Sequence, residues 1–159
     1  MIRTATPADI PALHTLIREL ADYEKSLAEA KATPHQLHEA LFGAHPAAYA
    51  HLAVDDTTHE PVGYAIWFLN FSTWRGVHGI HLEDLYVRPT ARGTGHGKAL
   101  LTELARICVD RGYARLEWSV LNWNTPSIAF YDSLGAHPQD DWTAYRLTDE
   151  ALTRLGAGR

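Results

Sequence analysis

The order and patterning of the predicted elements indicate an α/β protein, of the α+β kind, built around one central sheet. Apolar runs and period-2 alternation predict strands near residues 2–5, 49–54, 62–71, 77–87, 116–121 and 145–147. Capping signals followed by apolar residues at helical spacing predict the helices between them. Because strands and helices alternate through the second half of the chain, we expect one mixed, twisted sheet with helices on both faces.

Length and composition predict one ordinary globular domain. The chain has 159 residues, of which 46% are hydrophobic and 21% are charged. No apolar run reaches the length of a membrane span, the first residues lack a signal-peptide core, and the formal charge of -5 argues against nucleic acid as a partner. A single cysteine, Cys108, excludes an internal disulfide and is typical of a reducing compartment. We therefore expect one domain over residues 1–159, in the cytoplasm, that binds neither membranes nor nucleic acid.

Two start signals predict the helices of the first third of the chain. Thr6-Pro7-Ala8-Asp9 combines an N-cap, a proline and an acid, and the apolar stripe after it predicts a helix to about Tyr23. Thr33-Pro34-His35-Gln36 is a capping box before a short stripe that ends at Gly43. The polar residues 25–32 between these helices predict a connector.

The middle of the chain carries the strands that we expect at the centre of the sheet. Residues 62–71 are strongly apolar, as in a strand that is buried on both faces, and a turn at 72–76 leads into the strand Val77–Val87. The helix that follows should run to about Asp110, with Gly112 as its C-cap. The predicted elements after it are a strand at Leu116–Leu121, a helix from Thr125 to Gly135, a strand at Tyr145–Leu147 and a last helical turn.

A basic, glycine-rich loop joins the strand Val77–Val87 to its helix. It contains Arg92, Gly93, Gly95 and Gly97, and glycines let main-chain N–H groups converge on an anion beside the positive end of a helix. A Walker A loop is excluded because Arg92 stands in place of its first glycine, and the dinucleotide fingerprint lacks its third glycine. The spacing Arg-x-x-Gly-x-Gly resembles the acetyl-coenzyme A pyrophosphate loop of the GNAT superfamily of N-acetyltransferases. Alone, it would also suit a glycine-rich turn without a ligand.

A second motif makes the resemblance more specific. Asn124, Ser127 and Tyr131, followed by Leu134-Gly135-Ala136, resemble the second cofactor motif of the same superfamily, 32 residues after Arg92. A lone tyrosine would more often be a packed aromatic, but two motifs in this order are far more specific than one. The resemblance to the diamine (spermidine/spermine) and thialysine acetyltransferase branch covers nearly the whole chain and includes Tyr23-Glu24, residues 72–76 and Leu82-Glu83-Asp84.

The resemblance implies an N-acetyltransferase that uses acetyl-CoA and no metal. Backbone groups of the motif strand would bind the pantetheine arm and the acetyl carbonyl, and the loop would bind the pyrophosphate. It assigns the cofactor to Leu85, Tyr86, Val87, Arg92, Gly93, Thr94, Gly95, His96, Gly97, Lys98, Asn124 and Ser127. It also implies a homodimer, which the composition does not show.

Acetyl transfer to an amine needs a base for the ammonium proton and an acid for the departing thiolate. Aliphatic amines have a pKa near ~10.4, and Glu83 is the best candidate for the base, acting through water. The other interpretation of Glu83 is a solvated strand acid. Asp84 would lie on the opposite strand face unless a β-bulge intervenes, as the resemblance implies. Tyr131 is the matching acid, because a phenol pKa of about 10 is close to that of a thiol.

The acceptor is expected to be a small primary amine, and the transfer would be direct within a ternary complex. The resemblance assigns the amine to Tyr23, Glu24, Trp74, Glu83 and Asp84. The polyamine enzymes carry acidic residues just before the last strand, where this chain has residues 142–144. Whether Asp140 and Asp141, a little upstream, replace those acidic contacts stays open. The polyamine enzymes carry basic residues after the catalytic tyrosine, and this chain has Asp132 and Ser133 in their place. The alternatives are a protein lysine or N-terminal acetyltransferase and a CoA-binding regulatory module without turnover.

The histidines do not predict a metal site. The chain has 10 of them, with His35 and His38 at helical spacing and with His78 and His81 on one strand beside Glu83. No HExxH motif and no Cys/His cluster accompanies them. We therefore expect no metal.

Overall fold

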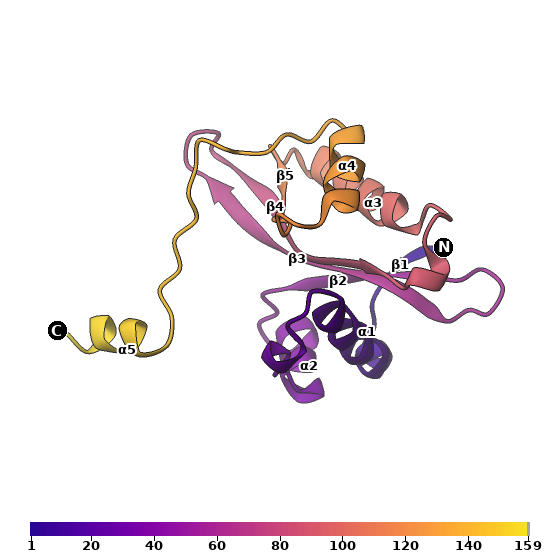
Figure 1. Cartoon of the computed structure of the whole chain (residues 1–159), viewed down its shortest axis with the longest axis horizontal. Helices are drawn as coiled ribbons and strands as arrows, with labels where there is room; N and C mark the ends of the chain where they lie inside the picture. The colour runs from indigo at the N-terminus through magenta and orange to yellow at the C-terminus, as the bar shows by residue number, and fades with distance from the viewer. Residues whose placement is uncertain (159) are drawn as a thin grey trace. The chain divides into compact units, whose positions relative to one another are not determined.

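The computed structural model describes residues 1–158, which form two compact units, one of Met1–Ser119 and one from Val120 onwards. The described residues of the first unit form a sheet in the order β1-β2-β3-β4-β5 (Figure 1). Neighbouring strands are antiparallel except β4 and β5, which are parallel, so the predicted mixed sheet is confirmed. The strands are β1 (Ile2–Thr4), β2 (Tyr49–Val54), β3 (Pro61–Ser72), β4 (Val77–Val87) and β5 (Leu116–Glu117).

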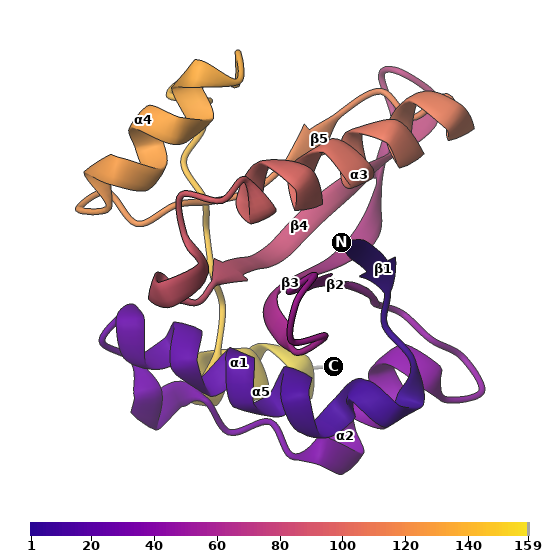
Figure 2. The ribbon, with the colours of Figure 1, turned by 90° about the vertical axis from the view of Figure 1, so that its right-hand side faces the viewer.

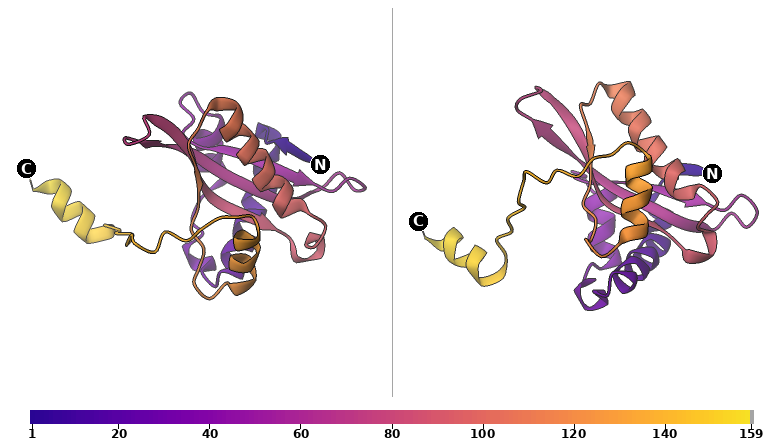
Figure 3. Two further views of the ribbon diagram at one scale, coloured as in Figure 1. Left: turned by 90° about the horizontal axis from the view of Figure 1, so that it is seen from above. Right: turned by 45° about the horizontal axis from the view of Figure 1, so that its top comes forward.

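Helices cover both faces of this sheet. On one face lie α1 (Ile10–Tyr23) and α2 (Pro34–Phe42), and on the other lies α3 (His96–Arg111) (Figure 2). Figure 3 shows α3 against the sheet from two further directions. The connections include three short 3-10 turns, η1 (Pro7–Asp9), η2 (Leu27–Glu29) and η3 (Pro89–Ala91).

The predicted capping signals start the first two helices. Asp9 Oδ2 accepts hydrogen bonds from the Thr6 backbone N–H (2.7 Å) and hydroxyl (3.0 Å), and the Arg3 guanidinium donates to both Asp9 oxygens at 2.7 and 2.8 Å. These bonds, with that from Arg3 the largest, lower the pKa of Asp9 from 3.8 to about 2. At the start of α2, the Gln36 backbone N–H donates to the Thr33 hydroxyl and the Gln36 side chain accepts from the Thr33 N–H.

Apolar side chains fill both faces of the sheet. On the α1–α2 face, Leu13 and Leu16 of α1 belong to a buried cluster with Leu52, Tyr64 and Tyr86 from three adjacent strands. The adjacent residues Tyr64 and Ala65 of β3 are both fully buried, so this strand is covered on both faces, as its composition predicts. Burying each large apolar side chain contributes about 1.5–3 kcal/mol to the free energy of folding.

A β-bulge interrupts the pairing of β3 with β4. Trp67 pairs with Leu82 while Ile66 pairs with Asp84, so Glu83 is the extra residue without a partner of its own. Leu82 and Asp84 are two positions apart and would otherwise point to the same face. Since Ile66 and Trp67 are adjacent, their partners Asp84 and Leu82 lie on opposite faces, and Asp84 joins the α1–α2 face. The bulge implied by the family resemblance is therefore confirmed.

The second unit contains α4 (Thr125–Ser133) and α5 (Asp149–Ala157). The strand predicted at Tyr145–Leu147 is wrong, because among the described residues this segment pairs with no strand, and Tyr145 is 96% exposed. The strand predicted at Leu116–Leu121 shortens to Leu116–Glu117, since only these residues pair with β4. No helix in residues 1–158 has the length and hydropathy needed to cross a membrane.

Candidate active site

The predicted anion loop connects β4 to α3 in the first unit. Gly93 and Gly95 have φ values of +77° and +87°, in the region that favours glycine, and Gly95 is the N-cap of α3. The first N–H groups of an α-helix have no partner within the helix, so those of His96, Gly97 and Lys98 are available to an anion. Backbone donors, a helix N-terminus and the Lys98 ammonium make a donor set that suits a pyrophosphate.

Arg92 links this loop to the end of α1. Its Nε donates a hydrogen bond to the Val87 carbonyl at 2.8 Å, and its guanidinium carbon lies 4.9 Å from the ring centroid of Tyr23 and 5.8 Å from that of Tyr86. Tyr23 is the last residue of α1. The structure therefore brings a residue predicted to bind the amine next to residues predicted to bind the cofactor.

Two carboxylates lie at the β4 bulge, in different surroundings. The Glu83 side chain is 59% exposed, with Oε2 3.8 Å from His81 Nε2. Asp84 is partly buried, and its Oδ2 accepts a hydrogen bond of 2.9 Å from the hydroxyl of Tyr64, which is fully buried.

Burial is the main reason why the pKa of Asp84 is raised from 3.8 to about 6. The hydrogen bond from Tyr64 opposes this shift, and the charges of Glu83 and Glu24 add to it. Burial also raises the pKa of Glu24, the C-cap of α1. The predicted amine-side residues Glu24 and Asp84 thus form one acidic neighbourhood, in which a cation is favoured.

The second cofactor motif lies in the second unit. Asn124 is the predicted N-cap of α4, and its Oδ1 accepts a hydrogen bond from the Ser127 N–H at 3.4 Å. Tyr131 lies in the second half of α4, with its ring centroid 5.6 Å from that of Phe130. The helix therefore starts where the sequence predicts and carries the tyrosine that the motif requires.

Comparison with known proteins gives the family. Residues 13–136 match the sequence model described as the Acetyltransferase (GNAT) family. The chain belongs to the GNAT family. It is 34% identical to a thialysine N-epsilon-acetyltransferase from Bos taurus, over 98% of this chain and 96% of that protein. It is also 28% identical to an L-ornithine N5-acetyltransferase from Arabidopsis thaliana, over 97% of this chain and 86% of that protein.

Solved structures agree with the family. An integron cassette protein from the mobile metagenome of V. cholerae superposes with a TM-score of 0.83 at 25% identity, covering 99% of this chain and 98% of that one. A probable acetyltransferase superposes with a TM-score of 0.81 at 20% identity, covering 94% and 98%, which shows the fold. The chain is therefore an N-acetyltransferase by family, as the two motifs predict.

Within this GNAT chain, Trp74 lies apart from the other predicted amine-side residues. It occupies the turn between β3 and β4 and is 89% exposed. Seven residues of β4, with a rise of about 3.3 Å each, separate Val77 from Asp84 by roughly 23 Å. The first unit by itself therefore does not bring Trp74 to the acidic neighbourhood.

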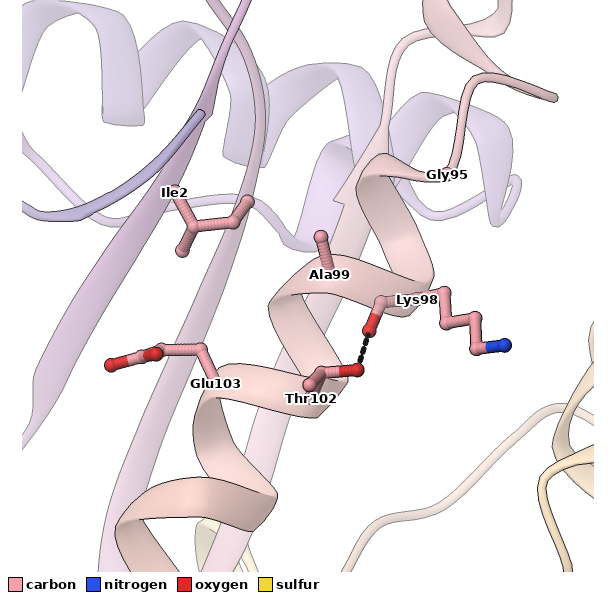
Figure 4. A pocket seen from close by; sticks show the side chains of 6 residues that line it. All are labelled: Ile2, Gly95, Lys98, Ala99, Thr102 and Glu103. Carbon is pink, nitrogen blue, oxygen red and sulfur yellow. Dashed lines mark hydrogen bonds between the residues drawn. The ribbon is translucent and has the colours of Figure 1, made fainter.

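Tyr64 is the residue of this neighbourhood that sequence reasoning missed. The signal was present, because a tyrosine inside an apolar central strand needs a partner for its hydroxyl. A shallow hollow elsewhere in the unit lies beside the loop, between β1 and the first turns of α3, and is lined by Ile2, Gly95, Lys98, Ala99, Thr102 and Glu103 (Figure 4). It contains neither bulge carboxylate. No metal-binding cluster of His, Cys, Asp or Glu occurs in the part of the chain that the structure describes.

Proposed function

We propose that the protein transfers the acetyl group of acetyl-CoA to a primary amine of a small, cationic molecule of the thialysine or polyamine type. The observation that carries the proposal is the placement of Glu24 and Asp84 in one acidic neighbourhood, beside a glycine loop built for an anion. An ammonium ion and a diphosphate have opposite charges, and these two places suit one each.

The loop residues fit the coenzyme that GNAT acetyltransferases use. Residues 92–98 would hold the pyrophosphate through backbone N–H groups, and Leu85, Tyr86 and Val87 of β4 would hold the pantetheine arm. Asn124 and Ser127 of the second motif would contribute further contacts to the coenzyme. Bound acetyl-CoA supplies the activated acetyl group.

The acid and base roles follow the chemistry of the step. Tyr131 is the proposed acid for the thiolate, in a direct transfer within a ternary complex. Glu83 is the base predicted from the sequence, and Asp84 is the second carboxylate at the same bulge. A carboxylate at the bulge lowers the barrier by taking a proton from the ammonium form of the amine, which dominates at neutral pH.

The relatives support the class of acceptor. Two relatives are named for thialysine and for L-ornithine. A third, from Homo sapiens, is a spermidine/spermine N(1)-acetyltransferase-like protein that is 31% identical over 95% of this chain and 23% of that protein. All three names refer to small molecules with cationic amines. Among them we favour no single acceptor.

We also propose a homodimer. The C-terminal segment carries large apolar side chains that are exposed in the single chain, among them Trp142 at 72% and Tyr145 at 96%. Exposed apolar side chains in one segment favour contact with a partner surface. The cytoplasmic location expected from the composition stays a prediction.

A thiol-release assay with a panel of amines tests the proposed function. The panel contains thialysine, ornithine, spermidine, spermine and a lysine-bearing peptide, each with acetyl-CoA. We expect thiol release with at least one of the small amines and a much lower kcat/KM with the peptide. Preferential acetylation of the peptide would indicate a protein acetyltransferase, and release with none of the amines would refute the proposal.

A further inference from the structure

Two carboxylates compete for the role of proton acceptor at the β4 bulge, and their surroundings separate them. The Glu83 side chain is 59% exposed, so water reaches its carboxylate.

 

Asp84, by contrast, is turned by the bulge toward the α1–α2 face, where it is partly buried and held at 2.9 Å by the Tyr64 hydroxyl. A proton acceptor works best when its own proton affinity approaches that of the donor, which favours the shielded carboxylate over the solvated one.

Only one oxygen of the Asp84 carboxylate accepts a hydrogen bond from the described part of the chain. Tyr64 donates to Oδ2, and within residues 1–158 no hydrogen bond reaches Oδ1. No buried side-chain oxygen or nitrogen in this part of the chain lacks a partner, so Oδ1 is open to the surface. One oxygen is therefore fixed by the protein and the other can receive a ligand.

We propose that Asp84 accepts the proton of the substrate ammonium and that Tyr64 is the positioning residue that orients it and limits its proton affinity. This inference rests on the proposed function. In the step, an ammonium N–H bond breaks and an O–H bond forms on Asp84 Oδ1, which frees the nitrogen lone pair to attack the thioester carbonyl. As the C–S bond breaks, the nitrogen loses a second proton and the thiolate gains one. One proton is released to solvent overall.

The groups that face Asp84 fix the direction of the pH dependence. Tyr64 of β3 stabilises the charged carboxylate by its hydrogen bond, whereas burial, Glu83 of β4 and Glu24 at the end of α1 stabilise the protonated form. The result is a pKa of about 6, which is roughly a hundredfold higher in proton affinity than the ordinary value of 3.8. Activity should therefore fall as the pH drops through about 6, because the acceptor becomes protonated.

The test is the pH profile of kcat/KM for the best amine of the panel, in matched variants of the full chain. Tyr64→Phe removes the hydroxyl that stabilises the carboxylate, so the acid limb should move up by about one pH unit. At pH 6 this shift lowers kcat/KM by about fivefold, and at pH 8.5 it leaves kcat/KM nearly unchanged. Asp84→Asn should abolish the limb. Tyr49→Phe, a matched change on β2, should leave the limb in place.

A second readout does not depend on turnover. With ¹³C-carboxyl aspartate, one resonance should titrate near pH 6, disappear in Asp84→Asn and titrate at higher pH in Tyr64→Phe. If Tyr64→Phe fails to fold, the loss of both the resonance and the limb in Asp84→Asn decides the matter.

Three results would overturn the inference: a limb that Glu83→Gln removes and Asp84→Asn retains, a Tyr64→Phe profile lowered equally at every pH, or no aspartate that titrates near pH 6. If the wild type acetylates no amine, the proposed function fails and this inference fails with it. An aspartate resonance that shifts as expected would then show an electrostatic pair without a role in transfer.

Discussion

Two glycines of the anion loop should respond to the same substitution with opposite signs. Gly95 has a φ of +87°, and a Cβ added there meets no atom within 4 Å, so an alanine is opposed by backbone conformation alone. An L-residue in the left-handed region costs about 1–2 kcal/mol. Gly97 lies inside α3 with its Cβ position 3.9 Å from a Val87 methyl carbon, an ordinary contact. Alanine is favoured over glycine in a helix by about 0.5–1 kcal/mol.

We therefore expect Gly95→Ala to lower the free energy of unfolding by about 1–2 kcal/mol and Gly97→Ala to raise it by up to about 1 kcal/mol. For a chain of this length, 1 kcal/mol changes Tm by about 2–4 °C. Urea unfolding monitored by tryptophan fluorescence measures both values. Equal effects of the two substitutions would refute the assignment of conformational strain to Gly95, and a destabilised Gly97→Ala would refute the expected gain in helix stability at Gly97.

The same pair separates folding from coenzyme binding. If the backbone of residues 92–98 approaches a pyrophosphate, a methyl group at Gly97 weakens acetyl-CoA binding although the fold is not weakened. Isothermal titration of Gly97→Ala with acetyl-CoA measures this effect. Unchanged affinity would count against the loop as the pyrophosphate site, because a Cβ would then be tolerated where the ligand is expected.

Three further predictions each concern a single side chain. Asp9→Asn should lower the free energy of unfolding at pH 7 by about 1–2 kcal/mol, and the difference should shrink in urea titrations as the pH falls from about 4 toward 2, since the folded-state pKa of Asp9 is about 2. His51, whose Nδ1 accepts from Trp67 Nε1 at 3.1 Å, has its pKa lowered chiefly by burial. Its neutral form is favoured in the fold, so Tm should drop below pH 6.5 in the wild type and drop less in His51→Gln. Tyr131→Phe should lower kcat by ~10²–10⁴-fold and leave acetyl-CoA affinity, measured by titration, nearly unchanged.

Local signals in the sequence were sufficient for most of the fold. The strand Val77–Val87 has the predicted bounds, and both capping signals start helices, because capping depends on residues within a few positions of each other. The strand predicted at Tyr145–Leu147 is wrong because strand formation depends on residues that are distant in the sequence. Its alternation is that of a strand, but a strand also needs a neighbour, and no local pattern supplies one.

The candidate site was predictable in its residues more than in its contacts. The glycine loop and the N-cap Asn124 follow from motif spacing. The hydrogen bond between Tyr64 and Asp84 joins strands 20 residues apart in sequence, and its existence depends on the register shift at Glu83. The sequence assigns the base role to Glu83, because the position of the bulge, which turns Asp84 toward α1, is set by strand pairing and not by a local pattern.

The bulge makes the motif strand sensitive to changes in length. Up to Leu82, β4 follows one alternation of inward and outward side chains, and from Asp84 it follows the reverse. Regular pairing of all three residues 82–84, without the bulge, would place Leu82 and Asp84 on the same face and exchange the two faces of everything on one side of Glu83. A deletion of Glu83 would leave both faces as they are but would remove the bulge and the carboxylate that it carries. Homologous enzymes should thus tolerate length variation in the turn 55–60 and show almost none between residues 82 and 84.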